Sequence, residues 1–193
     1  MSRPFVMRFV TSADRVEGLP DSEAEVAVVG RSNVGKSSLI NALGHSKKLA
    51  KVSNTPGRTR LLNLFAIEGG GSIVDLPGYG YAKASKELRA GWQRMIDRYL
   101  LERDGLAMVV VLVDGLVGPT DLDQEMLDWL RAHDIPHTVV ATKHDKVKAS
   151  IRTKRKRALA EGCQLEPGDI VWVSSQNGTG IDRLRSLMLG WLE

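Results

Sequence analysis

Short apolar runs rich in β-branched residues recur along the chain. Runs of this length that are apolar almost throughout are typical of parallel strands buried on both faces of a sheet. Four such strands are predicted, at Glu25 to Val29, Ala107 to Val113, His137 to Ala141 and Ile170 to Val173.

Two further strands are predicted at Leu61 to Ile67 and Ser72 to Asp75, separated only by Glu68 and three glycines. A glycine-rich connection this short predicts a hairpin, so one strand runs antiparallel to an otherwise parallel sheet. The pattern therefore predicts a six-stranded sheet.

Amphipathic segments lie between the strands. Helices are predicted over Ser85 to Arg103, Asp121 to Ala132 and Ile181 to Leu192. In the first of these, apolar side chains recur with helical spacing and form one stripe, which we assign to the core. The stripe consists of Leu88, Trp92, Met95, Ile96 and Tyr99. Alternating strands and helices predict an α/β fold, a three-layer sandwich whose ligands bind at the carboxyl ends of the strands.

The composition is that of one globular domain over residues 1–193, with 42% hydrophobic and 26% charged residues. The lone cysteine, Cys163, is interpreted as a small buried side chain rather than a reactive thiol. Arg3 and Arg8 interrupt the apolar residues at the N-terminus, and no run is long enough to span a bilayer. We expect a cytoplasmic monomer with no membrane contact, in which residues 1–22 form an N-terminal extension.

The net charge of +4 is concentrated in one segment, Lys143 to Arg157. Its eight cations are Lys143, Lys146, Lys148, Arg152, Lys154, Arg155, Lys156 and Arg157. Such clusters attract polyanions through counterion release. The alternative is a solvated helix face.

The most specific motif is G-x-x-x-x-G-K-[ST], which follows the first predicted strand and opens a helix. It reads Gly30-Arg31-Ser32-Asn33-Val34-Gly35-Lys36-Ser37. In this motif the backbone N–H groups face the phosphates, the lysine reaches the β- and γ-phosphates and the serine can bind Mg²⁺. A phosphate-binding loop is therefore predicted here.

A second motif, Asp75-Leu76-Pro77-Gly78, ends the second hairpin strand. A carboxylate at this position can hold Mg²⁺ through water, and the N–H of Gly78 can contact the γ-phosphate. The polar loop 53–60 precedes the hairpin. Within it Thr59 is the preferred residue to close on Mg²⁺ and the γ-phosphate, with Thr55 as the competing candidate.

Base selection is assigned to Thr142-Lys143-His144-Asp145, just after a predicted strand. A carboxylate can accept hydrogen bonds from N1–H and the 2-amino group of guanine, which adenine does not offer, and losing this pair costs about 1–3 kcal/mol or more. The stem of Lys143 can lie along the purine face. The commoner motif begins with Asn; Thr142 keeps a hydroxyl but loses the amide. Ser174-Ser175-Gln176, after the last strand, could support the base through backbone N–H groups.

Together these motifs resemble the EngB/YihA (YsxC) family of bacterial TRAFAC-class GTPases over nearly the whole chain, and the segment from Asp75 to Ala82, DLPGYGYA, is the most specific piece. The resemblance implies a Ras-like fold that binds GTP or GDP with Mg²⁺, held by Ser37 and Thr59. It also implies a role in assembly of the large ribosomal subunit and a link to cell division and septation. Carried over by motif, the nucleotide contacts add the segment Gly57-Arg58-Thr59-Arg60-Leu61 to the residues above.

The chain departs from the family after Asp114, where an Arg-His pair is usual and Gly115-Leu116-Val117-Gly118-Pro119 stands instead. We expect this loop to lie away from the nucleotide motifs. The departure leaves GTP binding intact and removes any partner contact made by that arginine.

The residues assigned to catalysis are Lys36, Thr59, Gly78 and Asn33. Ras-type enzymes place a glutamine directly after D-x-x-G to orient the attacking water. This chain has Tyr79 there, so slow intrinsic turnover is predicted. Asn33 could help to hold K⁺ beside the phosphates, or it could be a loop-capping amide. A ribosomal partner could also supply the missing group.

Three functions compete. The first is a GTPase switch in ribosome assembly, whose partner is a large-subunit precursor or rRNA bound by the basic surface. The second is a P-loop kinase or ATPase, disfavoured by the guanine motif. The third is an RNA-binding module in which Lys143 to Arg157 dominates and nucleotide only gates affinity.

Overall fold

A computed structural model of the chain describes residues 6–46, 48–50, 61–79 and 86–193, excluding the side chains of residues 86–90 and 92. Seven strands form one sheet in the order β1-β3-β4-β2-β5-β6-β7. The strands are β1 Met7–Ala13, β2 Glu25–Gly30, β3 Leu62–Ile67, β4 Ser72–Asp75, β5 Leu106–Asp114, β6 His137–Thr142 and β7 Val171–Trp172. Five α-helices accompany them in the described residues: α1 Lys36–Leu43, α2 Lys86–Glu102, α3 Asp121–Ala132, α4 Arg152–Gly162 and α5 Ile181–Trp191.

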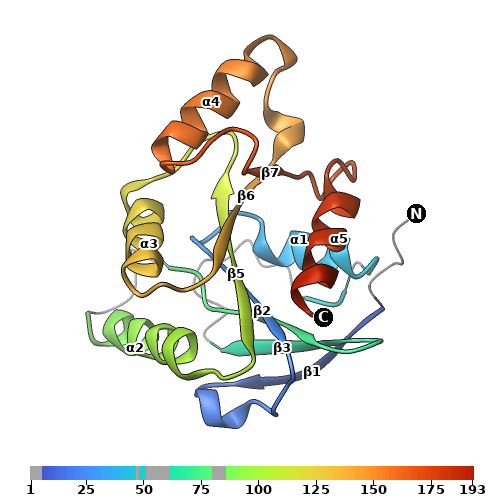
Figure 1. Ribbon diagram of the computed structural model, residues 1–193, viewed down its shortest axis with the longest axis vertical. Coiled ribbons are helices and arrows are strands. Elements are labelled where there is room, and N and C mark those ends of the chain that lie inside the picture. The colour runs from blue at the N-terminus through green and yellow to red at the C-terminus, as the bar shows by residue number, and fades with distance from the viewer. Residues whose placement is uncertain (1–5, 47, 51–60, 80–85) are drawn as a thin grey trace.

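Alternate residues of the central strands point to opposite faces of the sheet and build two cores. On one face Ala27 and Val29 of β2 pack with the buried side chains of α2 and α3. On the other face Val26 and Val28 pack with those of α1 and α5. Figure 1 shows the resulting three layers, with α4 beyond the end of β6. The predicted three-layer α/β fold is confirmed.

The predicted hairpin is present, because β3 pairs antiparallel with β4 and β4 pairs parallel with β2. The predicted number of strands is wrong. The N-terminal segment contributes β1, which pairs antiparallel with β3 from Met7 opposite Ile67 to Ala13 opposite Leu62. The strand lies at the edge of the sheet, and its consecutive residues Arg8 and Phe9 are both exposed, with Phe9 49% exposed. Part of the region assigned to an extension therefore belongs to the sheet.

A buried ion pair closes the end of the sheet away from the phosphate-binding loop. Glu25, at the start of β2, is fully buried. It accepts hydrogen bonds from the Tyr99 hydroxyl at 2.7 Å and from Arg103 Nη2 at 2.7 Å.

The core assignment of Ile96 and Tyr99 is confirmed, whereas the side chains of Leu88 and Trp92 lie outside the described residues.

Candidate functional site

The phosphate-binding loop turns directly from β2 into α1. Its turn requires left-handed backbone at Asn33, with φ of +66°, and at Gly35, with φ of +107°. A Cβ atom on Gly30 would lie 3.0 Å from Leu112 Cβ and 3.1 Å from the Leu112 carbonyl oxygen, so the loop leaves β2 where no side chain fits. The loop therefore places the first turn of an eight-residue helix beside the carboxyl ends of the central strands.

Lys36 and Asp75 meet in the centre of this site. The Lys36 ammonium donates a hydrogen bond to Asp75 Oδ1, and the two residues are 8% and 2% exposed. Asp75 ends β4 next to β2, which explains why residues 39 positions apart come together. The pairing places the phosphate-binding lysine against the carboxylate of D-x-x-G.

The same geometry fits Mg²⁺, a hard cation that prefers oxygen ligands. Ser37 directly follows Lys36 in the first turn of α1, and the Asp75 carboxylate accepts a hydrogen bond from the Lys36 ammonium group, so a hydroxyl-bearing residue and a carboxylate are both present at the start of this helix. Within the described residues no group of three or more His, Cys, Asp or Glu side chains could hold a metal by itself. A magnesium ion here would therefore depend on phosphate oxygens and water for most of its ligands.

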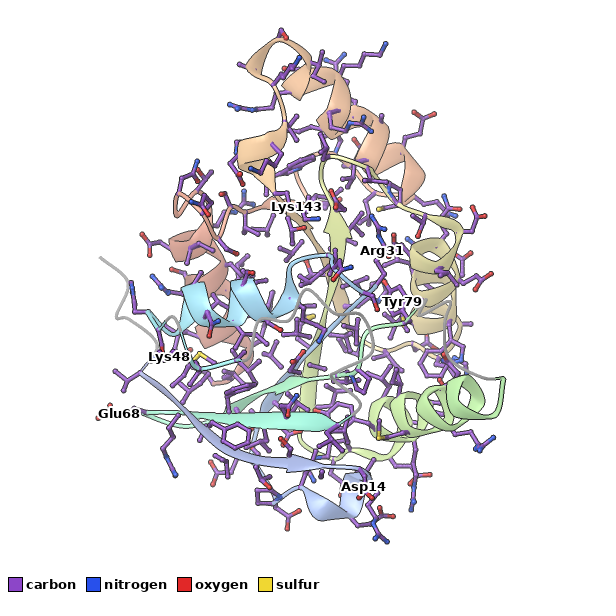
Figure 2. All side chains as sticks on the ribbon, turned by 180° about the vertical axis from the view of Figure 1, so that it is seen from behind. Asp14, Arg31, Lys48, Glu68, Tyr79 and Lys143 are labelled. Carbon is purple, nitrogen blue, oxygen red and sulfur yellow. The ribbon has the colours of Figure 1, made fainter. Side chains whose placement is uncertain are left out.

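The D-x-x-G segment is joined to the phosphate-binding loop by backbone contacts. The N–H of Ser32 donates to the Tyr79 carbonyl at 3.1 Å, and Arg31 and Tyr79 form a short parallel bridge. Figure 2 shows Arg31 and Tyr79 near the ends of the central strands. A Cβ atom on Gly78 would lie 3.3 Å from Gly30 O and from Ser32 N, so glycine permits this close approach.

The side chain of Tyr79 turns towards α3 and not towards the phosphate-binding loop. Its hydroxyl donates to Asp123 Oδ1 at 2.8 Å, and Asp123 is fully buried. Burial, followed by the charge and hydrogen bond of Asp123, raises the pKa of Tyr79 well above its ordinary value. The N–H and hydroxyl of Thr120 both donate to Asp123 Oδ2 at the start of α3, and Arg31 Nε of the phosphate-binding loop lies 3.9 Å from the same oxygen. The sequence carried no signal for Asp123.

The segment Thr142 to Asp145, predicted to select guanine and called the guanine-recognition segment below, is tied to the phosphate-binding loop by two side chains. The Thr142 hydroxyl donates to Val34 O at 2.6 Å, so threonine performs a bridging role without the amide. Lys143 has left-handed backbone, with φ of +57°, and its ammonium donates to Asn33 O at 3.0 Å. These bonds fix the end of β6 against the turn that precedes α1.

Asp145 is positioned by the last motif. The Ser174 hydroxyl donates to Asp145 Oδ1 at 2.7 Å and accepts from the N–H groups of Gln176 and Asn177 at 3.2 and 3.3 Å. The contribution of Ser174 therefore comes from its side chain, which the sequence argument had not assigned. Ser175 and Gln176 line the same cavity as Asp145, of about 800 Å³, together with Gly35, Thr142 and Lys143.

The loop after Asp114 adjoins this segment, so the expectation that it lies apart is wrong. Asp114 Oδ2 accepts from Lys143 at 2.7 Å, and Gly115 N–H donates to Thr142 O at 3.0 Å. Burial acts to raise the pKa of Asp114, but hydrogen bonds from Lys143, Val117 and Leu116 lower it overall. A Cβ atom at position 115 would lie 2.5 Å from Thr142 O, so the departure from Arg-His is accommodated by a backbone packed against the guanine segment.

Several predicted site residues lie outside the described residues. These are Gly57, Arg58, Thr59 and Arg60, with the competing Thr55. Leu61 is described and is 38% exposed. Asn33 is also exposed, and among the described residues no side-chain hydrogen bond of Asn33 is present to support a loop-capping role.

The fold and the site define a GTPase that binds nucleotide on a phosphate-binding loop. A family model described as 50S ribosome-binding GTPase matches residues 25–143. The probable GTP-binding protein EngB of Pelotomaculum thermopropionicum is 44% identical over 186 residues, covering 95% of this chain and 94% of that protein. The chain belongs to the EngB family of GTP-binding proteins, and its activity is GTP hydrolysis.

Solved structures agree with this assignment. A crystal structure of a probable GTP-binding protein EngB superposes with a TM-score of 0.70 at 25% identity, covering 88% of this chain and 98% of that one. A structure of Era in complex with MgGDPNP and nucleotides 1506–1542 of 16S ribosomal RNA has a TM-score of 0.70 at 26% identity, covering 90% and 58%. No helix within the described residues has the length and apolar character needed to cross a membrane.

Proposed function

We propose that this chain is a single G domain that uses Mg²⁺-dependent GTP hydrolysis as a conformational switch, with the nucleotide held as the sequence motifs predict. The observation that carries the proposal is the placement of Asp145 on the cavity wall beside the phosphate-binding loop, oriented by Ser174. A carboxylate held in this way can accept from N1–H and the 2-amino group of guanine, whereas adenine lacks that pair of donors.

Ser37 and Thr59 would hold Mg²⁺ together with the phosphates, and the ion would supply positive charge against the charge that develops on the transferring group. The chain's own residues supply the rest. Lys36 leaves Asp75 for the β- and γ-phosphates, and the N–H of Gly78 contacts the γ-phosphate. Because the side chain of Tyr79 is directed to Asp123, Tyr79 does not replace the water-orienting glutamine, and intrinsic turnover is slow.

Guanine selection is tested by competition of labelled GDP with GTP and ATP in Mg²⁺. We expect Asp145→Ala to lose about 5- to 150-fold in GTP affinity, equivalent to about 1–3 kcal/mol, and to lose most of the preference over ATP. Asp128→Ala, which removes an exposed carboxylate on α3, is the matched control and should bind GTP normally. Equal binding of GTP and ATP by the unaltered protein would overturn the proposal.

A bound K⁺ beside Asn33 is proposed to accelerate hydrolysis by offsetting phosphate charge. Support comes from the exposed position of Asn33 in the phosphate-binding loop. Single-turnover hydrolysis should be faster in KCl than in NaCl at equal ionic strength, and Asn33→Ala should remove the difference. Equal rates in the two salts would rule out the cation.

The cellular partner is proposed to be a precursor of the large ribosomal subunit, and the effect on cell division and septation to follow from it. The family description, 50S ribosome-binding GTPase, supports this partner, as does the structural likeness to Era bound to ribosomal RNA. Lysate is fractionated on sucrose gradients with GDP or a non-hydrolysable GTP analogue. Nucleotide-dependent comigration with a large-subunit precursor is expected, and absence of comigration in both nucleotides would overturn the assignment.

A further inference from the structure

The segment around α4 carries more positive charge than the whole chain. Residues 147–162 contain six cations and one acid, a formal charge of +5, whereas the chain carries +4 and the remainder is therefore −1. The cations are Lys148, Arg152, Lys154, Arg155, Lys156 and Arg157. Among the described residues none of them lies within 4.0 Å of a carboxylate oxygen or of the C-terminus.

This positive charge destabilises the helix α4. Arg152 and Lys154 lie in the first turn of α4, which contains no acidic residue, so their charges oppose the partial positive charge of the helix N-terminus. Arg152 and Lys156 are four residues apart and Lys154 and Arg157 three, spacings at which like charges repel by about 0.2–0.5 kcal/mol per pair. The requirements of folding therefore do not explain why these cations cluster on α4. A bound polyanion would offset both the repulsion from the helix N-terminus and the repulsion between the cations.

The cations are available on one side of the molecule. Lys148, Lys154 and Arg157 are exposed, while the buried side chains of α4 are limited to Leu159 and Ala160. Figure 1 shows α4 at one end of the molecule, beyond β6 and away from the β1 edge. The α4 surface, defined as Lys148, Lys154 and Arg157 with the partly buried Arg152, Arg155 and Lys156, is thus open to a large ligand.

The α4 surface adjoins the guanine-recognition segment without covering it. Lys156 Nζ lies 5.7 Å from the centre of the Trp172 ring, and Trp172 packs edge-on against His144 at 5.9 Å. Burial, followed by the charges of Arg152 and Lys156, lowers the pKa of His144 in this segment. None of the six cations lines the cavity that contains Asp145. Nucleotide and a polyanion can therefore be bound together.

We propose that the α4 surface binds the phosphate backbone of RNA while guanine nucleotide occupies its own site. The choice of RNA over an acidic polypeptide rests on the proposed ribosomal function, in which the accessible polyanion is RNA. Phosphate contacts from arginine and lysine give affinity that depends on salt and hardly on sequence. The surface is therefore expected to supply attachment to RNA rather than sequence selection.

The test uses the full chain loaded with GDP and Mg²⁺, and labelled polyuridylate as the probe, with fluorescence anisotropy measured over a range of salt concentrations. The variant Lys154→Gln/Arg157→Gln removes two exposed cations from the α4 surface. The control variant Arg8→Gln/Arg183→Gln removes the same charge from exposed positions on β1 and α5. All four changes are at the surface, where effects on stability are within about 0.5 kcal/mol.

The slope of log affinity against log salt is negative. For the α4 variant we expect its magnitude to decrease by about 1.4, since each lost single-strand contact contributes about 0.7. The control variant should keep the original slope. Equal loss in both variants would show a dependence on net charge alone and would overturn the proposal, as would equal competition by polyglutamate. Guanine preference is measured on the same samples. Absence of guanine preference in the unaltered protein would overturn the proposed GTPase site. If guanine preference is present and only the RNA result fails, the RNA proposal alone is overturned.

Discussion

The hydroxyl of Tyr79 offers a direct test of how the D-x-x-G segment is anchored. The perturbation is Tyr79→Phe, which deletes one hydroxyl and leaves the ring. In the native protein this hydroxyl donates to the fully buried Asp123 at 2.8 Å. The variant leaves Asp123 with the two hydrogen bonds from Thr120.

The magnitude follows from the nature of the acceptor. A hydrogen bond to a charged group contributes about 1.5–3 kcal/mol to stability, and the remaining bonds to Asp123 favour the lower end. For a domain of this size, 1 kcal/mol corresponds to about 2–4 °C in Tm. We therefore expect Tyr79→Phe to lower Tm by about 3–6 °C at neutral pH, measured by calorimetry on nucleotide-free protein.

The same group sets a dependence on pH. Because the folded state raises the pKa of Tyr79, its contribution to stability is fully present below the unfolded pKa, near 10. The contribution is lost as pH rises through the folded pKa. Above about pH 10 the free energy of unfolding, measured with denaturant, should accordingly decrease less for Tyr79→Phe than for the unaltered protein.

Tyr99→Phe is the matched control, because it also removes a phenol that donates to a buried carboxylate, here Glu25 at 2.7 Å. Both variants should lose similar stability, and neither should lose hydrolysis, since the Tyr79 hydroxyl faces α3. Removing a group that transfers a proton costs about 100-fold or more in rate. A loss of that size in single-turnover hydrolysis by Tyr79→Phe alone would refute this reasoning.

Three further outcomes are expected. Ser174→Ala leaves Asp145 without its hydroxyl donor, so GDP affinity should fall about tenfold, or about 1.4 kcal/mol, in calorimetric titration; unchanged affinity would contradict this positioning role. Gly115→Ala places a Cβ atom 2.5 Å from Thr142 O and should cost about 1–3 kcal/mol in denaturant unfolding, together with weaker GDP binding; full stability would show that the backbone yields freely. Cys163 is buried and burial raises the pKa of its thiol to about 11, so thiol reagents should modify the folded protein at pH 8 far more slowly than the unfolded protein; rapid labelling without unfolding would contradict its structural role.

Features that depend on neighbours along the chain could be predicted from the residues alone. Apolar periodicity placed α3 at Asp121–Ala132 and β4 at Ser72–Asp75 with the bounds that the structure has. The phosphate-binding loop could be predicted because its function requires glycine, lysine and serine at fixed spacing between a strand and a helix. The order of the motifs along an alternating α/β chain then indicated GTP, because parallel strands bring their carboxyl ends to one edge.

Tertiary structure decided which distant groups share a hydrogen bond. The β1 strand pairs with β3 between residues 49 to 60 positions apart (Ala13 with Leu62, Met7 with Ile67), and the residue pattern of Met7–Ala13 does not identify that partner. Tyr79 reaches Asp123, and Ser174 orients Asp145 through its hydroxyl, at separations of 44 and 29 residues. Local propensity and spacing act within a few turns of chain, whereas these contacts arise only when packing has fixed the relative positions of helices and strands.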